Sequence, residues 1–217
     1  MSKINHWVMA IAGLSAGLPG YALTWEKTSL DLAMEAGVAE ITAEFPFKNE
    51  GEAPVTLTEL RSNCGCAQPT VKSKVVPPGG SDVVKVVYTP GDRVGPQSAQ
   101  LVVRTDEKGV SPALLSLRVN IRSAVSLTPR LVRWSKAEGV VPRTIEIKQL
   151  GEKPMRILEV KPMSDALSAE LKPGSETGTW LLTLTPKSTE SPSTTKVQIH
   201  TEEGVRKTTY TVFGVVR

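Results

Sequence analysis

Apolar and polar residues alternate with a period of two in several parts of this chain. Apolar residues occupy every second position in four stretches: 84–88, 115–121, 180–184 and 197–199. Successive side chains of a β-strand point to opposite faces, so this period predicts strands with one buried face. We expect 115–121 and 180–184 in particular to be strands.

Clusters of Gly, Pro, Asn and Asp separate these stretches, for example at 49–51, 77–80 and 90–92. Short strands at near-regular spacing with such turns between them are typical of an antiparallel β-sandwich. We therefore predict an all-β fold. The expected core residues of the first part are Val55, Leu57, Val84, Val86, Leu101, Val103, Leu115, Leu117 and Val119. Those of the second part are Trp180, Leu182, Leu184, Val197 and Ile199.

The chain contains an internal repeat. Three pairs of segments match: 49–60 with 149–160, 88–90 with 184–186, and 101–107 with 196–202, the last within one residue of register. A repeat unit of about 95 residues indicates two domains of one fold, each near the length of a seven-stranded sandwich.

We place a signal peptide at 1–22, a first domain at 23–124 and a second domain at 125–217. The boundary region, 123–126, contains no flexible Gly/Ser linker. We therefore expect a strand to pass directly from one domain to the next and to hold the pair stiffly.

The first 22 residues have the features of a secretory signal peptide. Lys3 and His6 form a short polar head, and 7–18 is an apolar run without charge. Gly20-Tyr21-Ala22 places small residues at the positions that signal peptidase reads. A membrane span needs about 20 apolar residues, and Pro19 ends this run earlier. We expect cleavage before Leu23, no stable membrane span afterwards, and a periplasmic or extracellular location.

The charge balance does not indicate a nucleic-acid partner. The chain has 26 Lys and Arg against 22 Asp and Glu, a formal net charge of +4, and only 5% aromatic residues. Its longest basic run is the pair Arg206-Lys207. Nucleic-acid binding usually needs a concentrated basic patch, so we expect an ordinary mixed-charge surface.

Both cysteines lie in one motif, Cys64-Gly65-Cys66, between two strand-like segments. Paired cysteines in an exported chain form a disulfide by default. Cα atoms two residues apart are about 5.5–7 Å from each other, which overlaps the range for a disulfide. We expect Asn63 and Gly65 to support the turn, with Gly65 permitting the bend because glycine tolerates positive φ.

The second copy of the repeat has no cysteine at the corresponding place, where it reads Pro162-Met163-Ser164-Asp165-Ala166. A sandwich of this kind therefore does not need the motif in general. The motif is either a local structural device or a functional one.

Three roles for the cysteines stay open: a structural turn disulfide, a thiol–disulfide exchange site and a Cu(I) site. Exposed, strained disulfides exchange readily, and two thiolates favour Cu(I). Against a metal, His200 is the only histidine after residue 22 and belongs to the other domain. Zinc requires four ligands. We expect no cofactor, with copper at Cys64 and Cys66 as the alternative.

The residues around the motif resemble a bacterial family. The resemblance rests on Phe47, Asn49, Gly51, Pro54-Val55-Thr56-Leu57, Ser62-Asn63-Cys64-Gly65-Cys66 and Pro78-Gly79. Over residues 25–124 this order is similar to the family called domain of unknown function 1573, whose domains are similar to the immunoglobulin-like domains of abnormal-spindle and hydin proteins. The chain departs from the family pattern at Ala67, where a threonine is usual, and at Pro96-Gln97, where an aromatic is usual. The resemblance implies an exported immunoglobulin-like β-sandwich and brings no established activity.

Motifs of ordinary enzymes are absent from residues 23–217, which contain no G-x-S-x-G, H-E-x-x-H or phosphate loop. We interpret the carboxylate pair Glu202-Glu203 as a charged hairpin turn. The sequence thus predicts two tandem immunoglobulin-like domains that act as a non-enzymatic binding or structural module for another exported or envelope protein. The alternative is a thiol–disulfide exchange or Cu(I)-handling accessory that uses Cys64 and Cys66.

Overall fold

The computed structural model describes residues 22–151 and 153–217. Except for Ala22, the predicted signal peptide lies outside these residues, as does Glu152 of the repeat. Within the described part of the chain, no helix has the length and apolar character needed to cross a membrane.

The first β-sandwich consists of nine strands in two sheets. They are β1 (Leu23–Trp25), β2 (Ser29–Met34), β3 (Ile41–Asn49), β4 (Val55–Ser62), β5 (Ala67–Thr70), β6 (Val75–Val76), β7 (Ser81–Tyr88), β8 (Gly95–Thr105) and β9 (Ala113–Ile121). One sheet has the order β1-β3-β7-β5 and the other β2-β9-β8-β4-β6.

The second β-sandwich has eight strands and one short 3₁₀ helix. They are β10 (Val125–Thr128), β11 (Leu131–Trp134), η1 (Lys136–Glu138), β12 (Arg143–Gln149), β13 (Met155–Pro162), β14 (Leu167–Pro173), β15 (Thr179–Pro186), β16 (Ser193–Glu203) and β17 (Arg206–Val216). Its sheets have the orders β10-β12-β15-β14 and β11-β17-β16-β13. The all-β tandem sandwich fold predicted from the alternating pattern is confirmed.

Every strand of the second sandwich has a counterpart in the first, which has β6 in addition. The correspondence extends to detail: β2 pairs with β9 in parallel, as β11 does with β17. The bulge between Leu57 and Glu59 recurs between Ile157 and Glu159. The internal repeat in the sequence therefore reflects a repeated strand order.

One of the three predicted segment matches is displaced. Tyr88 pairs with Ala67, whereas the residue that pairs with Leu167 is Pro186. Tyr88 thus corresponds to Pro186 and not to Leu184. The predicted match rested on a shared Thr-Pro pair, which lies two positions earlier along the strand in the second copy.

Each sandwich encloses its own hydrophobic core. All the predicted core residues are buried except Trp180, which is partly buried at the start of β15 and packs against the second core. The largest fully buried side chain is Trp134 in β11, which the alternation did not single out.

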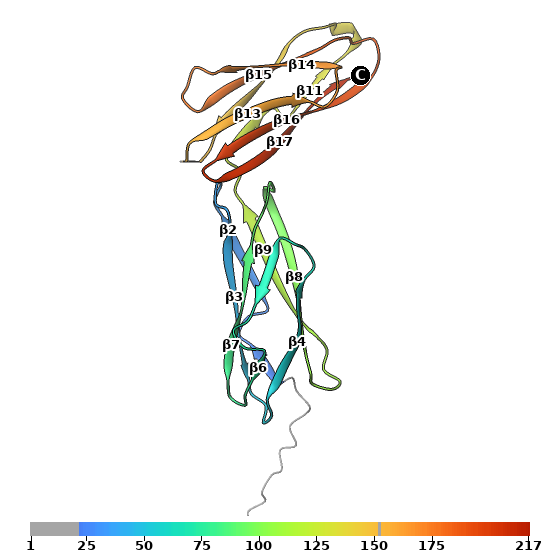
Figure 1. The fold of residues 1–217 in the computed structure, drawn as a ribbon. Coiled ribbons are helices and arrows are strands. Elements are labelled where there is room, and N and C mark those ends of the chain that lie inside the picture. The colour runs from blue at the N-terminus through green and yellow to red at the C-terminus, as the bar shows by residue number, and fades with distance from the viewer. Residues whose placement is uncertain (1–21, 152) are drawn as a thin grey trace, which may run out of the picture.

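The two sandwiches lie end to end (Figure 1). Strand β9 ends at Ile121 and β10 begins at Val125, so residues 122–124 interrupt the strand that we expected to run through. The link is nevertheless tied down, because Ala124 donates its backbone N–H to the Tyr210 hydroxyl and accepts a bond from the N–H of Leu150.

Candidate functional site

The motif Cys64-Gly65-Cys66 forms the crossover between the two sheets of the first sandwich. It connects the end of β4, in the five-stranded sheet, to the start of β5, in the four-stranded sheet. Cys64 and Cys66 are joined in a disulfide with their Cα atoms 5.2 Å apart. Both cysteines are half-buried against the core, whereas Gly65 at the apex is exposed.

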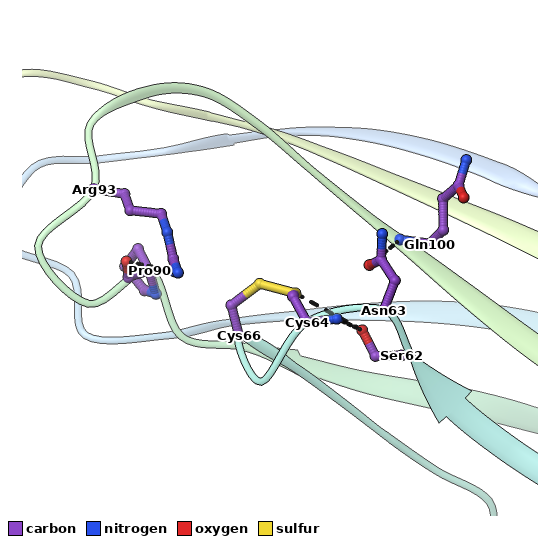
Figure 2. Close-up of a disulfide and its surroundings, with 7 residues drawn as sticks. All are labelled: Ser62, Asn63, Cys64, Cys66, Pro90, Arg93 and Gln100. Atoms are coloured by element: carbon purple, nitrogen blue, oxygen red, sulfur yellow. Dashed lines mark hydrogen bonds between the residues drawn. A yellow bond between two sulfur atoms is a disulfide. The ribbon is translucent and has the colours of Figure 1, made fainter.

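Hydrogen bonds hold this turn on both sides, and Figure 2 shows the side of Asn63 and Gln100. Asn63 donates its N–H to the Gln100 carbonyl, and its side-chain oxygen accepts the Gln100 N–H, both at 2.9 Å. On the other side, the Thr89 N–H donates to the Cys66 carbonyl at 2.8 Å. The turn is therefore fastened to β8 and to the residue that follows β7.

The corresponding turn of the second sandwich keeps the same backbone bonds without a disulfide. Met163 donates to the Lys196 carbonyl at 2.8 Å, and Lys187 donates to the Ala166 carbonyl at 2.9 Å. These bonds match those of Asn63 and Thr89. The crossover itself therefore does not depend on the cysteines.

A side-chain hydrogen bond stands in the second sandwich where the first has the disulfide. The Ser164 hydroxyl lies 2.8 Å from the Thr195 hydroxyl. By the same register, Cys64 faces Ala99, which has no polar side chain. We conclude that the disulfide fixes the turn of the first sandwich in the way that the Ser164–Thr195 bond fixes the second.

Gly65 does not have the conformation that we expected. It is not among the glycines with positive φ, and a Cβ built on it would meet nothing within 4 Å. The 5.2 Å separation of the flanking Cα atoms is reached without a left-handed residue. Neither backbone strain nor packing requires glycine here, and the space that a side chain would occupy is open.

The closed disulfide limits the chemistry of the motif in this state. Thiolates are the nucleophiles and the Cu(I) ligands, so exchange as the attacking thiol or copper binding requires prior reduction. The two lysines that follow the motif in the sequence, Lys72 and Lys74, have exposed side chains. Within residues 22–151 and 153–217, no group of three or more His, Cys, Asp and Glu side chains is arranged to hold a metal ion.

A second set of polar residues lies where the two sandwiches meet, at the tip of the β16–β17 hairpin. The Arg206 side chain is 5% exposed. It donates through Nε to the Gly91 carbonyl at 2.9 Å and through a terminal nitrogen to the Arg93 carbonyl. The hairpin also lies close to Gly37, since a Cβ there would be 3.1 Å from the Glu203 carbonyl oxygen.

Our interpretation of Glu202-Glu203 as a charged turn is only half correct. Glu202 forms an ion pair with Arg156 on the surface, but Glu203 is 2% exposed. The alternation explains this, because the buried positions Val197 and Ile199 continue in steps of two through Thr201 to Glu203. Extending the period-two pattern into the polar residues would have indicated that Glu203 is buried.

The profile of the family described as Protein of unknown function (DUF1573) matches residues 23–121. The first domain of this chain matches that family and is called the DUF1573 domain below. The match ends at Ile121, the last residue of β9, so it spans the first sandwich. No curated protein sequence matches the chain.

Solved structures of related fold share little sequence with the chain. The PapD-like domain 7 of human CEP192 is 13% identical, and the match covers 57% of this chain and 99% of that one, with a TM-score of 0.39. SSP-19, an MSP-domain protein like family member of Caenorhabditis elegans, is 17% identical over 45% of this chain and 98% of that one, TM-score 0.35. The Vibrio cholerae VesB protease is 15% identical, with a TM-score of 0.34. The match covers 46% of this chain and 32% of the protease. These likenesses carry no statement about activity.

The DUF1573 domain should tolerate loss of its disulfide. The disulfide closes a loop of only three residues, and stabilisation by the chain-entropy mechanism grows with loop length. Replacing both Cys64 and Cys66 by serine should therefore lower the free energy of unfolding by less than the roughly 2–5 kcal/mol typical of small secreted domains. Urea unfolding of the oxidised wild type and the double variant measures this. A loss at or above that range would contradict a purely local role.

Burial controls the ionisation of the groups at the domain junction. Loss of hydration raises the pKa of Glu203 above its ordinary value of 4.5, against the lowering effects of Arg206 and of the bond from the Tyr210 hydroxyl. The pKa of Tyr210 is raised by its burial and by the Glu203 charge. Burial also raises the pKa of Tyr88, while Arg93 and Arg206 lower it.

These shifts predict that Glu203 weakens folding as the pH rises. A carboxyl group whose pKa is raised on folding gives its full stabilising contribution only below its unfolded value and loses it as the pH passes the folded value. Glu203→Gln should thus gain stability relative to the wild type as the pH increases above about 4.5. Urea unfolding of both proteins between pH 4 and pH 8 tests this. A difference that shrinks or stays constant over this interval would contradict it.

Proposed function

We propose that this protein is an exported, non-enzymatic two-domain module that binds another exported or envelope protein through the disulfide turn of its DUF1573 domain. One observation carries the proposal: Gly65 is exposed at the apex of that turn, where neither its φ nor its packing requires glycine. The lack of a side chain there keeps the backbone and the disulfide open to an approaching surface.

The turn also has the rigidity that a binding surface benefits from. Its backbone is fastened to Gln100 and to Thr89, and the disulfide removes the remaining freedom of the turn. Binding to a preorganised surface avoids the entropic cost of ordering a loop. The corresponding turn of the second sandwich, residues 163–166, here called the twin turn, has the exposed Asp165 at the position of Gly65.

A second candidate function is thiol–disulfide exchange, with Cu(I) handling as its reduced-state variant. The half-burial of Cys64 and Cys66 at the surface favours it. Its test is a redox titration of the wild-type chain. A reduction potential below about −300 mV, the range of ordinary structural disulfides, would exclude the exchange function.

The binding proposal can be tested by site-specific photo-cross-linking in the native envelope. A photoreactive amino acid replaces Gln68, an exposed residue next to the turn, or Ser168, its counterpart beside the twin turn. We expect a defined adduct from position 68, no adduct from position 168, and loss of the adduct when Gly65→Asp is added. Equal adducts from both positions, or an adduct that survives Gly65→Asp, would contradict the proposal.

The same Gly65→Asp variant must remain folded for this test to be meaningful. A Cβ at Gly65 enters open space, so its urea unfolding curve should overlie that of the wild type. A Gly65→Ala variant adds only a Cβ at this position and is the milder substitution. It should be as stable as the wild type or more stable by about 0.4–1 kcal/mol, because alanine restricts the unfolded chain.

A further inference from the structure

We propose that the redox state of Cys64 and Cys66 controls how firmly the two domains are docked, through the segment 89–94. This inference concerns regulation and does not depend on the proposed binding partner. Its starting point is that the segment is held from opposite sides, by the disulfide turn of the first domain and by the hairpin tip of the second.

The first hold comes from the turn. The Cys66 carbonyl accepts the Thr89 N–H at 2.8 Å, at the point where the chain leaves β7 and enters the segment. Figure 2 shows the disulfide beside Pro90 and Arg93. Within the segment, the Arg93 side chain and backbone N–H both bond to the Pro90 carbonyl, at 3.2 and 3.3 Å, which makes it a compact loop.

The second hold comes from the other domain. Arg206 binds the carbonyls of Gly91 and Arg93, and Val94 packs against the core of the second sandwich. Arg206 is nearly fully buried, so its two acceptors must stay in place for the guanidinium to remain paired. The geometry of the loop thus sets whether the hairpin tip can dock.

Reduction removes the only covalent cross-link of the turn and leaves the hydrogen bonds of Ser62, Asn63 and Cys66 to hold it. A dithiol donates two electrons and two protons, the Cys64–Cys66 bond breaks, both sulfurs become thiols, and the dithiol becomes a disulfide. The twin turn is tied to the neighbouring strand by the Ser164–Thr195 bond, whereas Ala99 at the corresponding place has no hydroxyl. The polar side chain beside the Cys64 sulfur is Ser62, 3.8 Å away and within the turn itself, so it gives no tie to β8. The reduced turn is then held by hydrogen bonds alone, so we expect the Cys66–Thr89 bond to weaken and the loop that Arg206 binds to lose part of its support.

The coupling can be read from amide hydrogen exchange of the full chain, oxidised and after treatment with dithiothreitol. We expect reduction to speed exchange in the peptides covering 89–94 and 203–208 at least about fivefold, the lower end of what coupled sites show. The β8–β9 hairpin tip at 106–110, at the other end of the first sandwich, serves as the internal control and should not change.

Two variants decide whether the effect passes through the disulfide and Arg206. In a turn transplant, Cys64→Ser, Cys66→Ala and Ala99→Thr install the hydroxyl pair of the twin turn, and dithiothreitol should have no effect on either peptide. In Arg206→Ala, the 203–208 peptide should already exchange fast, and reduction should add nothing. Unchanged exchange at 203–208 in the reduced wild type, with 89–94 either altered or not, would overturn the inference.

Discussion

Trp134→Ala should destabilise the second domain by about 3–5 kcal/mol, the range for truncating a large buried aromatic residue. The Trp134 side chain is 1% exposed, and its indole N–H donates to the Val141 carbonyl at 2.6 Å. The backbone of β17 packs directly on the ring, since a Cβ on Gly214 would lie 3.1 Å from it. The cavity left by the alanine cannot collapse easily, because the strands on both sides are fixed by their sheet.

The matched control for this prediction is Trp180→Ala, which removes the same side chain from a partly buried position on β15. Urea unfolding followed by far-UV circular dichroism measures both. The Trp180 variant should lose clearly less stability. Equal losses would mean that Trp134 does not occupy the centre of the second core.

Arg206→Ala should weaken the junction of the two domains by about 1.5–3 kcal/mol, the range for hydrogen bonds to a charged group. The substitution removes the donors to the Gly91 and Arg93 carbonyls and also takes away the positive charge that offsets the buried Glu203 carboxylate. The loss of the two hydrogen bonds acts on the docked state alone, whereas the loss of the charge acts within the β16–β17 hairpin, where Glu203 pairs with Arg206.

Lys207→Ala is the control for Arg206→Ala, because Lys207 is the exposed neighbour on the same strand. Surface substitutions of this kind usually change stability by less than about 0.5 kcal/mol. Small-angle scattering should show a wider range of inter-domain arrangements for the Arg206 variant and an unchanged curve for the Lys207 variant. Identical scattering from the two variants would show that Arg206 does not hold the domains together.

Periodicity predicted the fold well, because burial on one face of a strand acts on every second residue. Leu115, Leu117 and Val119 are all within 1% of full burial, as their alternation indicated. The repeat predicted the matching strand orders for a related reason. Residues 49–60 and 149–160 each form a turn and a strand at the same place in their sandwich, so their residue types remain recognisably similar.

The domain junction was beyond the reach of sequence reasoning. Glu203 continues the period-two pattern of β16, but Arg206 has the residue type of a solvated hairpin tip and is bound by backbone carbonyls of the neighbouring domain. That contact joins residues 115 positions apart, Arg206 and Gly91, and no local pattern encodes such a distance. The difference between the two turns could not be predicted for a similar reason. Ala99 matters only because the corresponding residue of the second sandwich, Thr195, bonds the turn through Ser164.

We propose that the disulfide turn of the DUF1573 domain forms a binding surface that the fold itself does not need. The most direct test combines the turn transplant with Gly65→Asp and measures the photo-cross-linking yield from position 68 in the native envelope. The account predicts that this variant unfolds at the same urea concentration as the wild type and yields no adduct. A folded variant that still gives the wild-type adduct would contradict the claim.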